Sequence, residues 1–117
     1  MPNTLTKNNR RFNHSVGFVQ KEPTFDATDT DIDFRLSNKQ KLTLTGNITD
    51  VHFQFPAESG NFLCVFLQDG TGGWDVSNWK TKFGATTLTE TANKADIVSI
   101  YWDADNELAY AVASENF

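Results

Sequence analysis

The sequence predicts an all-β fold: an antiparallel β-sandwich, jelly-roll-like, or a small barrel, preceded by an extended N-terminal arm. Apolar and polar residues alternate with a period of two in several short segments, which is typical of strands with one buried face. Threonine and asparagine are the commonest residues, at fourteen and eleven of 117, and both disfavour helix interiors. No window of eleven or more residues has the periodicity of an amphipathic helix.

The clearest strand predictions come from residues 30–67. Segment 30–37 alternates, and it should place Ile32, Phe34 and Leu36 on one buried face. Segments 41–45 and 51–55 repeat the pattern, whereas 62–67 is apolar throughout and is predicted as a central strand buried on both sides. Shorter strands are expected at 15–20, 74–79, 82–83, 86–89, 95–102 and 108–113.

Charge divides the chain into two parts. Residues 1–21 contain four basic side chains and no acidic one, whereas residues 22–117 contain six basic and fifteen acidic side chains, a net charge of −9. We therefore expect residues 1–20 to form an extended basic arm and residues 21–117 to form a single β-domain. Such an arm is attracted to an anionic partner, and its candidate anchoring residues are Lys7, Arg10, Arg11, Phe12 and Phe18.

The residues that most often carry catalysis are sparse and scattered. Cys64 is the only cysteine, so no intrachain disulfide can form, and its apolar surroundings predict a buried, unreactive thiol. His14 and His52 have no neighbouring His, Cys or acid at ligand spacing. We expect no enzymatic activity, no catalytic or metal site and no cofactor.

Three loop-like motifs fall short of known binding patterns. The aspartates at 29, 31 and 33 resemble the start of a calcium loop, but the glycine and glutamate that such a loop requires are absent, so we expect them on the solvent face of a strand. The acids at 103, 105 and 107 are expected to form an ordinary turn. The glycine-rich stretch 69–74 lacks the Lys and the following helix of a phosphate loop.

The aromatic residues leave two interpretations open. Trp74, Trp79, Tyr101 and Trp102 could form a stacking platform for sugars or single-stranded nucleic acid, or they could pack in the core or in a subunit interface. Tyr101 and Trp102 are adjacent in a predicted strand and must point to opposite faces, which favours packing. The acidic body disfavours nucleic acid as a partner, and no apolar stretch approaches the length that spans a bilayer.

Three stretches of the second half resemble a β-module of tailed-bacteriophage virion proteins. They are FLQDGTGG at 66–73, TTLTETANKADIVSIYW at 86–102 and YAVASENF at 110–117. In those proteins a strand ending in a glycine turn, a connection of this kind and a closing hairpin ending in Asn-Phe recur together. This chain departs from the pattern at Trp74, where a basic or small residue is common, and at 83–86, where Gly-Gly-x-x-Pro often stands.

The resemblance implies a virion structural protein. It suggests a capsid decoration (cement) protein that is made in the host cytoplasm and binds the major capsid protein on the outer head surface, and that stabilises the head by bridging capsid subunits. It further implies a homotrimer. From the acidic body and the lack of a long apolar stretch, we expect neither nucleic acid nor a membrane as a partner. The alternative is a head- or tail-fibre tip module that binds a host receptor or glycan.

Overall fold

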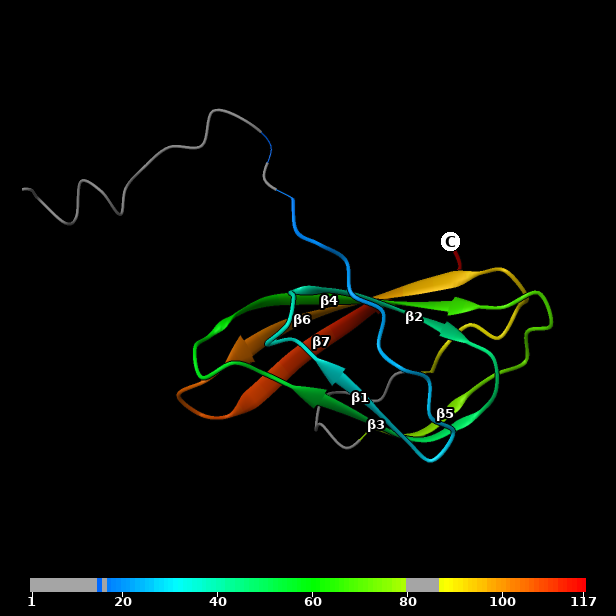
Figure 1. Cartoon of the computed structure of the whole chain (residues 1–117), viewed down its shortest axis with the longest axis horizontal. Helices are drawn as coiled ribbons and strands as arrows, with labels where there is room; N and C mark the ends of the chain where they lie inside the picture. Colours follow the sequence, from blue (N-terminus) through cyan, green and yellow to red (C-terminus); the bar gives the residue numbers. More distant parts are fainter. Residues whose placement is uncertain (1–14, 16, 80–86) are drawn as a thin grey trace, which may run out of the picture.

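The computed structural model describes residues 15, 17–79 and 87–117, and all of its regular structure is β (Figure 1). The predicted strand at 82–83 and four of the five predicted anchoring residues, Lys7, Arg10, Arg11 and Phe12, lie outside the described residues. The strands are β1 (Asp29–Asp33), β2 (Lys39–Leu44), β3 (Ile48–Gln54), β4 (Gly60–Gln68), β5 (Val76–Trp79), β6 (Ala95–Asp103) and β7 (Leu108–Ser114).

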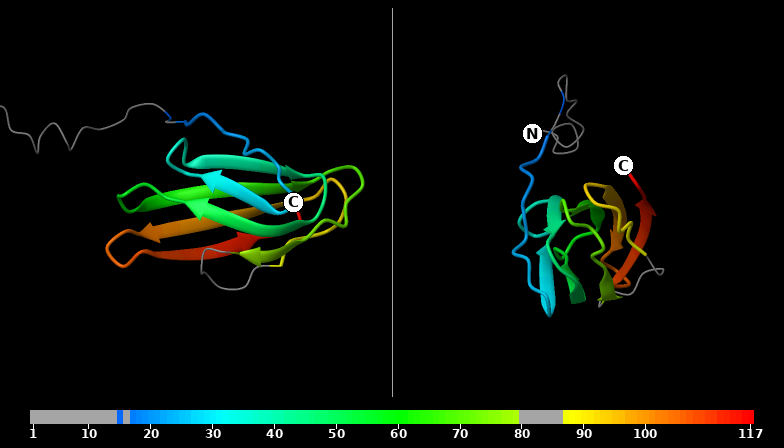
Figure 2. Two further views of the ribbon diagram at one scale, coloured as in Figure 1. Left: turned by 60° about the horizontal axis from the view of Figure 1, so that its bottom comes forward. Right: turned by 90° about the vertical axis from the view of Figure 1, so that its right-hand side faces the viewer.

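The strands form two sheets that pack on each other as a sandwich. One sheet has the order β1-β3-β5 and the other the order β2-β4-β6-β7. Seen along the strands, the two sheets lie as separate layers (Figure 2). The prediction of an all-β sandwich is therefore confirmed, and in the described part of the chain the sheets do not close into a barrel.

The strand directions differ from the antiparallel arrangement expected. Pairing is antiparallel between β4 and β6 and between β6 and β7, but it is parallel between β1 and β3, β3 and β5, and β2 and β4. From β1 to β5 each strand is followed by one in the opposite sheet that runs back the other way (Figure 1). Because neighbours within a sheet are then two strands apart in sequence, they run parallel, and no crossover helix is needed.

Aliphatic and aromatic side chains fill the space between the sheets, and the aromatic rings contact one another across it. The Phe34 ring centroid lies 5.5 Å from that of Phe53 and 5.1 Å from that of Phe62. Phe55 stacks on Trp102 at 4.4 Å with an interplanar angle of 6°. These contacts join strands of both sheets, so neither sheet can bury its inner face without the other.

Several details of the predicted strands are wrong. Leu36 is 68% exposed, because β1 ends at Asp33 and the backbone N–H of Leu36 turns back to the Asp33 carbonyl. Strand β4 is central, as predicted, but it is fully buried on one side only: Phe62, Cys64 and Phe66 point into the core, whereas the side chains between them are half-buried. The strands predicted at 15–20 and 86–89 are absent from the described residues of both segments, which have no regular structure.

A tight turn after β4 holds one end of the sandwich. Asp69 Oδ1 accepts hydrogen bonds from the backbone N–H of Thr71 and Gly72, both 3.0 Å, and from Trp74 Nε1 at 2.8 Å. Gly72 has φ +71°, and a Cβ added there would lie 2.6 Å from the backbone nitrogen of Ala92. The turn therefore requires glycine both for its backbone angle and for the close approach of the 89–94 connection.

Two buried polar side chains secure the same end. Gln68 donates to the carbonyls of Trp74 (2.7 Å) and Thr89 (3.0 Å), and it accepts from the Trp74 N–H. Asp96, which is 1% exposed, accepts from the backbone N–H of Thr89 and of Asn116. Because a buried polar group without a partner is costly, these contacts fix the connection and the chain end relative to β4 and β6.

The substitution Gly72→Ala should destabilise the fold by about 2–4 kcal/mol, since it combines an unfavourable positive φ with a backbone clash. Gly70→Ala is the matched control, because a Cβ at Gly70 meets no atom within 4 Å and the backbone there is ordinary. Urea denaturation of the two variants measures the difference. Equal stabilities would show that the turn does not need glycine at position 72.

Candidate functional site: the interaction surfaces

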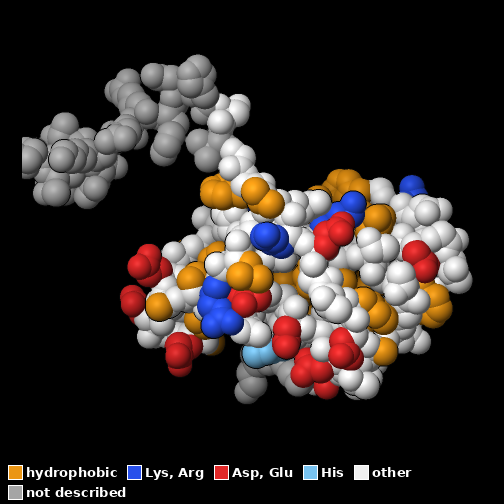
Figure 3. All heavy atoms as spheres, viewed as in Figure 1, with side chains coloured by type: hydrophobic (Ala, Val, Ile, Leu, Met, Phe, Trp, Pro, Cys, Tyr) orange, Lys and Arg blue, Asp and Glu red, His pale blue; other side chains and the backbone are white. Residues whose placement is uncertain are grey.

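The outer face of the β1-β3-β5 sheet is acidic. The register places Asp29 beside Asp50, and Asp31 beside His52, with their side chains turned to solvent. Figure 3 shows acidic side chains gathered around the histidine on this side of the molecule. The aspartates of the calcium-like motif thus occupy the solvent face of a strand, as predicted from their alternation.

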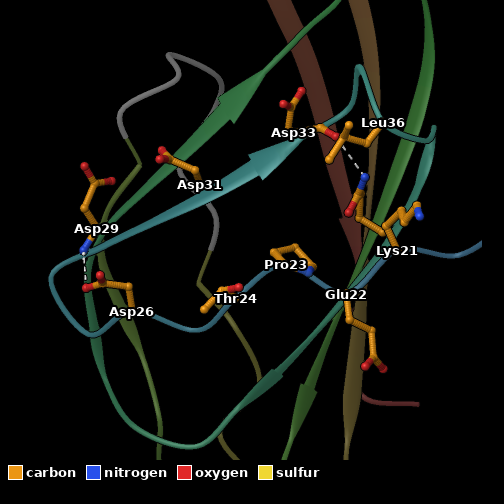
Figure 4. A pocket seen from close by; sticks show the side chains of 10 residues that line it. Lys21, Glu22, Pro23, Thr24, Asp26, Asp29, Asp31, Asp33 and Leu36 are labelled. Atoms are coloured by element: carbon orange, nitrogen blue, oxygen red, sulfur yellow. Dashed lines mark hydrogen bonds between the residues drawn. The ribbon is translucent and has the colours of Figure 1, made fainter.

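A hollow of about 420 Å³ lies between the segment that leads into β1 and β1 itself (Figure 4). Asp26 Oδ1 accepts from the N–H and hydroxyl of Thr28 and from the Asp29 N–H, and these bonds hold the pKa of Asp26 below its usual value. Within the described residues, no group of three or more His, Cys, Asp or Glu side chains is arranged to hold a metal ion. The residues that line the hollow are Lys21, Glu22, Pro23, Thr24, Asp26, Asp29, Asp31, Asp33, Leu36 and Gln40.

The segment that precedes the β-domain, residues 1–20, is the leading segment, and residues 21–117 are the body. The two meet at Lys21. The Lys21 N–H donates to the Lys39 carbonyl, and the Lys41 N–H donates to the Lys21 carbonyl, both at 2.9 Å. Just before this point Phe18 is 56% exposed and Val19 is 73% exposed. Phe18, the one predicted anchoring residue that the structure describes, therefore presents its ring to solvent, where a partner can contact it.

Cys64 and His52 lie in different environments of the body. Cys64 is fully buried between the sheets, and burial raises the pKa of its thiol, which disfavours the nucleophilic thiolate. His52 Nδ1 lies 3.4 Å from Asp31 Oδ1 on the exposed sheet face. The structure thus separates the thiol from the imidazole, with one in the core and the other in solvent.

Three of the four aromatic residues singled out from the sequence pack against the core. Trp102 stacks on Phe55 and donates from Nε1 to the Pro56 carbonyl, and Trp79 contacts both Phe53 and Phe66. Trp74 is half-buried and donates to Asp69. Tyr101 points the opposite way from Trp102 and is 48% exposed, so the packing interpretation holds for the tryptophans and not for Tyr101.

The outer face of the β2-β4-β6-β7 sheet was not predicted from the sequence to be an exposed apolar surface. The register places Leu63 beside Ser99, and Ser99 beside Val112, while Tyr101 lies beside Tyr110. A hollow of about 290 Å³ opens on this face. The signal was present in the unbroken apolar run 62–67 and in the alternation of 108–112, but full burial was the simpler interpretation of the run. The apolar members of this face are Leu63, Val65, Leu67, Ile97, Tyr101, Leu108, Tyr110 and Val112.

No protein-family model matches the chain, and no curated protein or solved structure is significantly similar to it. In the part of the chain that the structure describes, no helix has the length and apolar character needed to cross a membrane.

Cys64 should react with a thiol reagent such as Ellman's reagent only after unfolding, because its sulfur is enclosed between the sheets. We expect negligible reaction over minutes in buffer and complete reaction of one thiol in concentrated urea, followed by absorbance. A native rate close to that of free glutathione would place the thiol at the surface and contradict the structure.

Stability should fall on acidification, in part through Asp69. Hydrogen bonds from Gly72, Trp74 and Thr71 lower the pKa of Asp69, so its contribution is present above the unfolded-state pKa and is lost as pH falls through the lower folded-state pKa. Asp69→Asn removes this titration, and its melting temperature should fall less than that of the wild type between pH 5 and pH 2. Parallel curves for the two proteins would exclude this contribution.

Proposed function

We propose that the protein is a non-enzymatic adhesion module and, more specifically, a structural protein of a tailed-bacteriophage virion. Its role there is that of a capsid decoration protein, which binds the outer surface of the head and bridges capsid subunits. The observation that carries the proposal is that the described residues combine an enclosed thiol and core with two chemically different outer faces and with exposed side chains at Phe18 and Val19. A module of this design acts by binding energy and added surface burial.

The stretches that carry the virion-protein resemblance lie together in space. The glycine turn 69–73 contacts the 89–94 connection through the Gly73 N–H and the Glu90 carbonyl and through the Asn93 N–H and the Asp69 carbonyl. The chain end joins the same region, since Phe117 and Ala95 exchange two backbone hydrogen bonds. Their joint occurrence in the sequence thus has a physical basis, because each stretch supplies a partner that the others need.

Charge supports attachment through the leading segment. All fifteen acidic side chains but only five of the ten basic ones belong to the described residues, which therefore carry a net charge of −10. Lys7, Arg10 and Arg11 precede this acidic body. An anionic shell surface would attract the leading segment and repel the body, so the body would stay outside the shell.

The partners in this proposal are the major capsid protein and further copies of the chain, arranged as a homotrimer. The protein would be made in the host cytoplasm and would remain on the outer head surface of the virion. Binding of the protein would stabilise the assembled shell by mass action. The stability of the shell should therefore increase with the number of copies bound.

Replacing Lys7, Arg10 and Arg11 by Gln should abolish binding to heads, because the variant loses the charges that the proposal assigns to attachment. The measurement is co-sedimentation of purified protein with heads of the encoding phage that lack it. The wild type should bind at a fixed ratio to the major shell protein, and the variant should remain in the supernatant.

A matched control replaces Lys80, Lys82 and Lys94 by Gln, which changes the net charge equally but leaves the leading segment intact. This control should bind as the wild type does. Equal occupancy by wild type and leading-segment variant, or absence of the protein from purified heads, would overturn the proposal.

A further inference from the structure

The hollow of about 290 Å³ on the outer face of the β2-β4-β6-β7 sheet lies over two neighbouring rows of side chains. The register makes the rows, because it pairs β2 with β4, β4 with β6 and β6 with β7. Ser99 has the smallest side chain of the lining, and it lies between the larger side chains of Leu63 and Val112. Since such cross-strand neighbours are in contact range of one another, the short serine leaves a depression among them.

Two tyrosines border the hollow. Tyr101 and Tyr110 are directly opposite each other on antiparallel strands, and they are 48% and 57% exposed. The face of an aromatic ring is electron-rich and attracts the weakly positive C–H groups of a sugar ring. The phenol hydroxyl adds a group that can donate and accept a hydrogen bond. This side of the hollow is therefore suited to a ring that has an apolar face and polar edges.

Three polar side chains also line the hollow. Lys39 lies beside Leu63 in the register, Asn61 lies beside Tyr101, and Ser99 lies between the strands that carry them. Within the described part of the chain, these three side chains make no hydrogen bond or ion pair. Among the described residues of the lining, Lys39 alone carries a charge. The hollow therefore offers one cation and several neutral hydrogen-bonding groups beside an aromatic surface, a combination typical of small-molecule sites.

We propose that this hollow binds a pyranose sugar that carries a carboxylate, such as a hexuronate residue of a glycan. The apolar face of the sugar ring lies on Tyr101 and Tyr110, and its hydroxyls bond to Asn61 and Ser99. The carboxylate accepts a charge-assisted hydrogen bond from Lys39. The site is additional to the proposed attachment to the head and does not depend on it.

Size and charge favour an isolated acidic sugar over other ligands. Ligand pockets typically measure about 300–1,000 Å³, so a hollow of about 290 Å³ suits a small ligand. The described residues carry a net charge of −10, which repels a polyanion such as single-stranded nucleic acid, whereas one carboxylate needs only one lysine. A purely apolar ligand would cover Asn61 and Ser99 without offering them a hydrogen bond, which weakens binding.

The first test is a titration of the purified, ¹⁵N-labelled full-length chain with galacturonate, glucuronate or N-acetylneuraminate at neutral pH. For ligands of this size the dissociation constant should be on the order of 1 mM, and the amide signals of residues 61–63, 99–101 and 110–112 should shift. Galactose and glucose are matched controls, because each lacks only the carboxylate of its uronate. They should bind at least about fivefold more weakly.

The outcomes of this titration separate the parts of the proposal. Absence of shifts with all three acidic sugars overturns it. Equal affinity for galactose and galacturonate overturns the assignment of an acidic sugar. Equal shifts with acetate, which has the carboxylate but no ring, would show that an anion alone is bound. Because no capsid is used, these outcomes are independent of whether the protein binds heads.

The second test removes the charge. Lys39→Gln should weaken galacturonate binding about fivefold and leave galactose binding unchanged. Lys41→Gln is the matched control, because Lys41 projects from the same face of β2 but does not line the hollow. It should bind galacturonate as the wild type does. An equal loss in the two variants would show that the overall charge of β2 attracts the ligand, and it would overturn the site.

The third test fills the hollow. Ser99→Leu places a larger side chain at its centre and should abolish the shifts caused by galacturonate at up to about 20 mM. Thr43→Leu is the matched control, since Thr43 is an outer residue of β2 that does not line the hollow. If Ser99→Leu does not fold, as judged by its melting curve, Tyr110→Ser takes its place with at least tenfold weaker binding expected. Unchanged binding by the folded variant overturns the proposal.

Discussion

The fold depends on one constraint: the inner faces of both sheets must be buried by one shared set of apolar side chains, in which aromatic rings make contacts across the sandwich. Phe34 contacts Phe53 within its own sheet region and Phe62 across the sandwich, and Phe55 stacks on Trp102 of the opposite sheet. A three-stranded sheet alone would leave these rings in water, at a cost of about 1.5–3 kcal/mol for each ring. The alternation of strands between sheets meets this constraint locally, because each new strand covers the one before it.

The same constraint separates the inner and outer surfaces. Because strand side chains alternate, each residue fixed in the core sets the direction of its neighbours, so the outer faces can differ without disturbing the inner packing. The β1-β3-β5 sheet uses this freedom for aspartates, and the β2-β4-β6-β7 sheet uses it for aliphatic and tyrosine side chains. The architecture thus allows two chemically unlike outer faces on one shared core.

Local patterns in the sequence predicted most of the strands but not their partners. Period-two alternation located β1, β2 and β3, since one buried face leaves a direct trace in the residue order. Parallel pairing left no such trace, because it depends on how successive strands are shared between two sheets. Leu36 illustrates the limit: alternation continues through it, but the turn held by Asp33 ends the strand earlier.

The interaction surfaces were predictable to different degrees. The alternation of Asp29, Asp31 and Asp33 predicted the acidic face. The apolar face could not be predicted, because residue order does not distinguish an apolar strand that is covered on both sides from one whose outer side is exposed. Deciding between them required the register, which brings Leu63, Ser99 and Val112 into one row. The attachment role of Phe18 stays a prediction, to which the structure adds that its ring is accessible.

The end of the sandwich that holds Gln68 and Asp96 explains why polar residues occur in an otherwise apolar interior. An amide and a carboxylate that satisfy five hydrogen bonds to the backbone are specific to one arrangement of the turn, the connection and the chain end. Apolar residues of similar size could fill the space, but they would not fix the position of the 89–94 connection. Since β6 and β7 follow directly from that connection and carry Tyr101, Tyr110 and Val112, the geometry of the apolar outer face depends on these buried polar contacts.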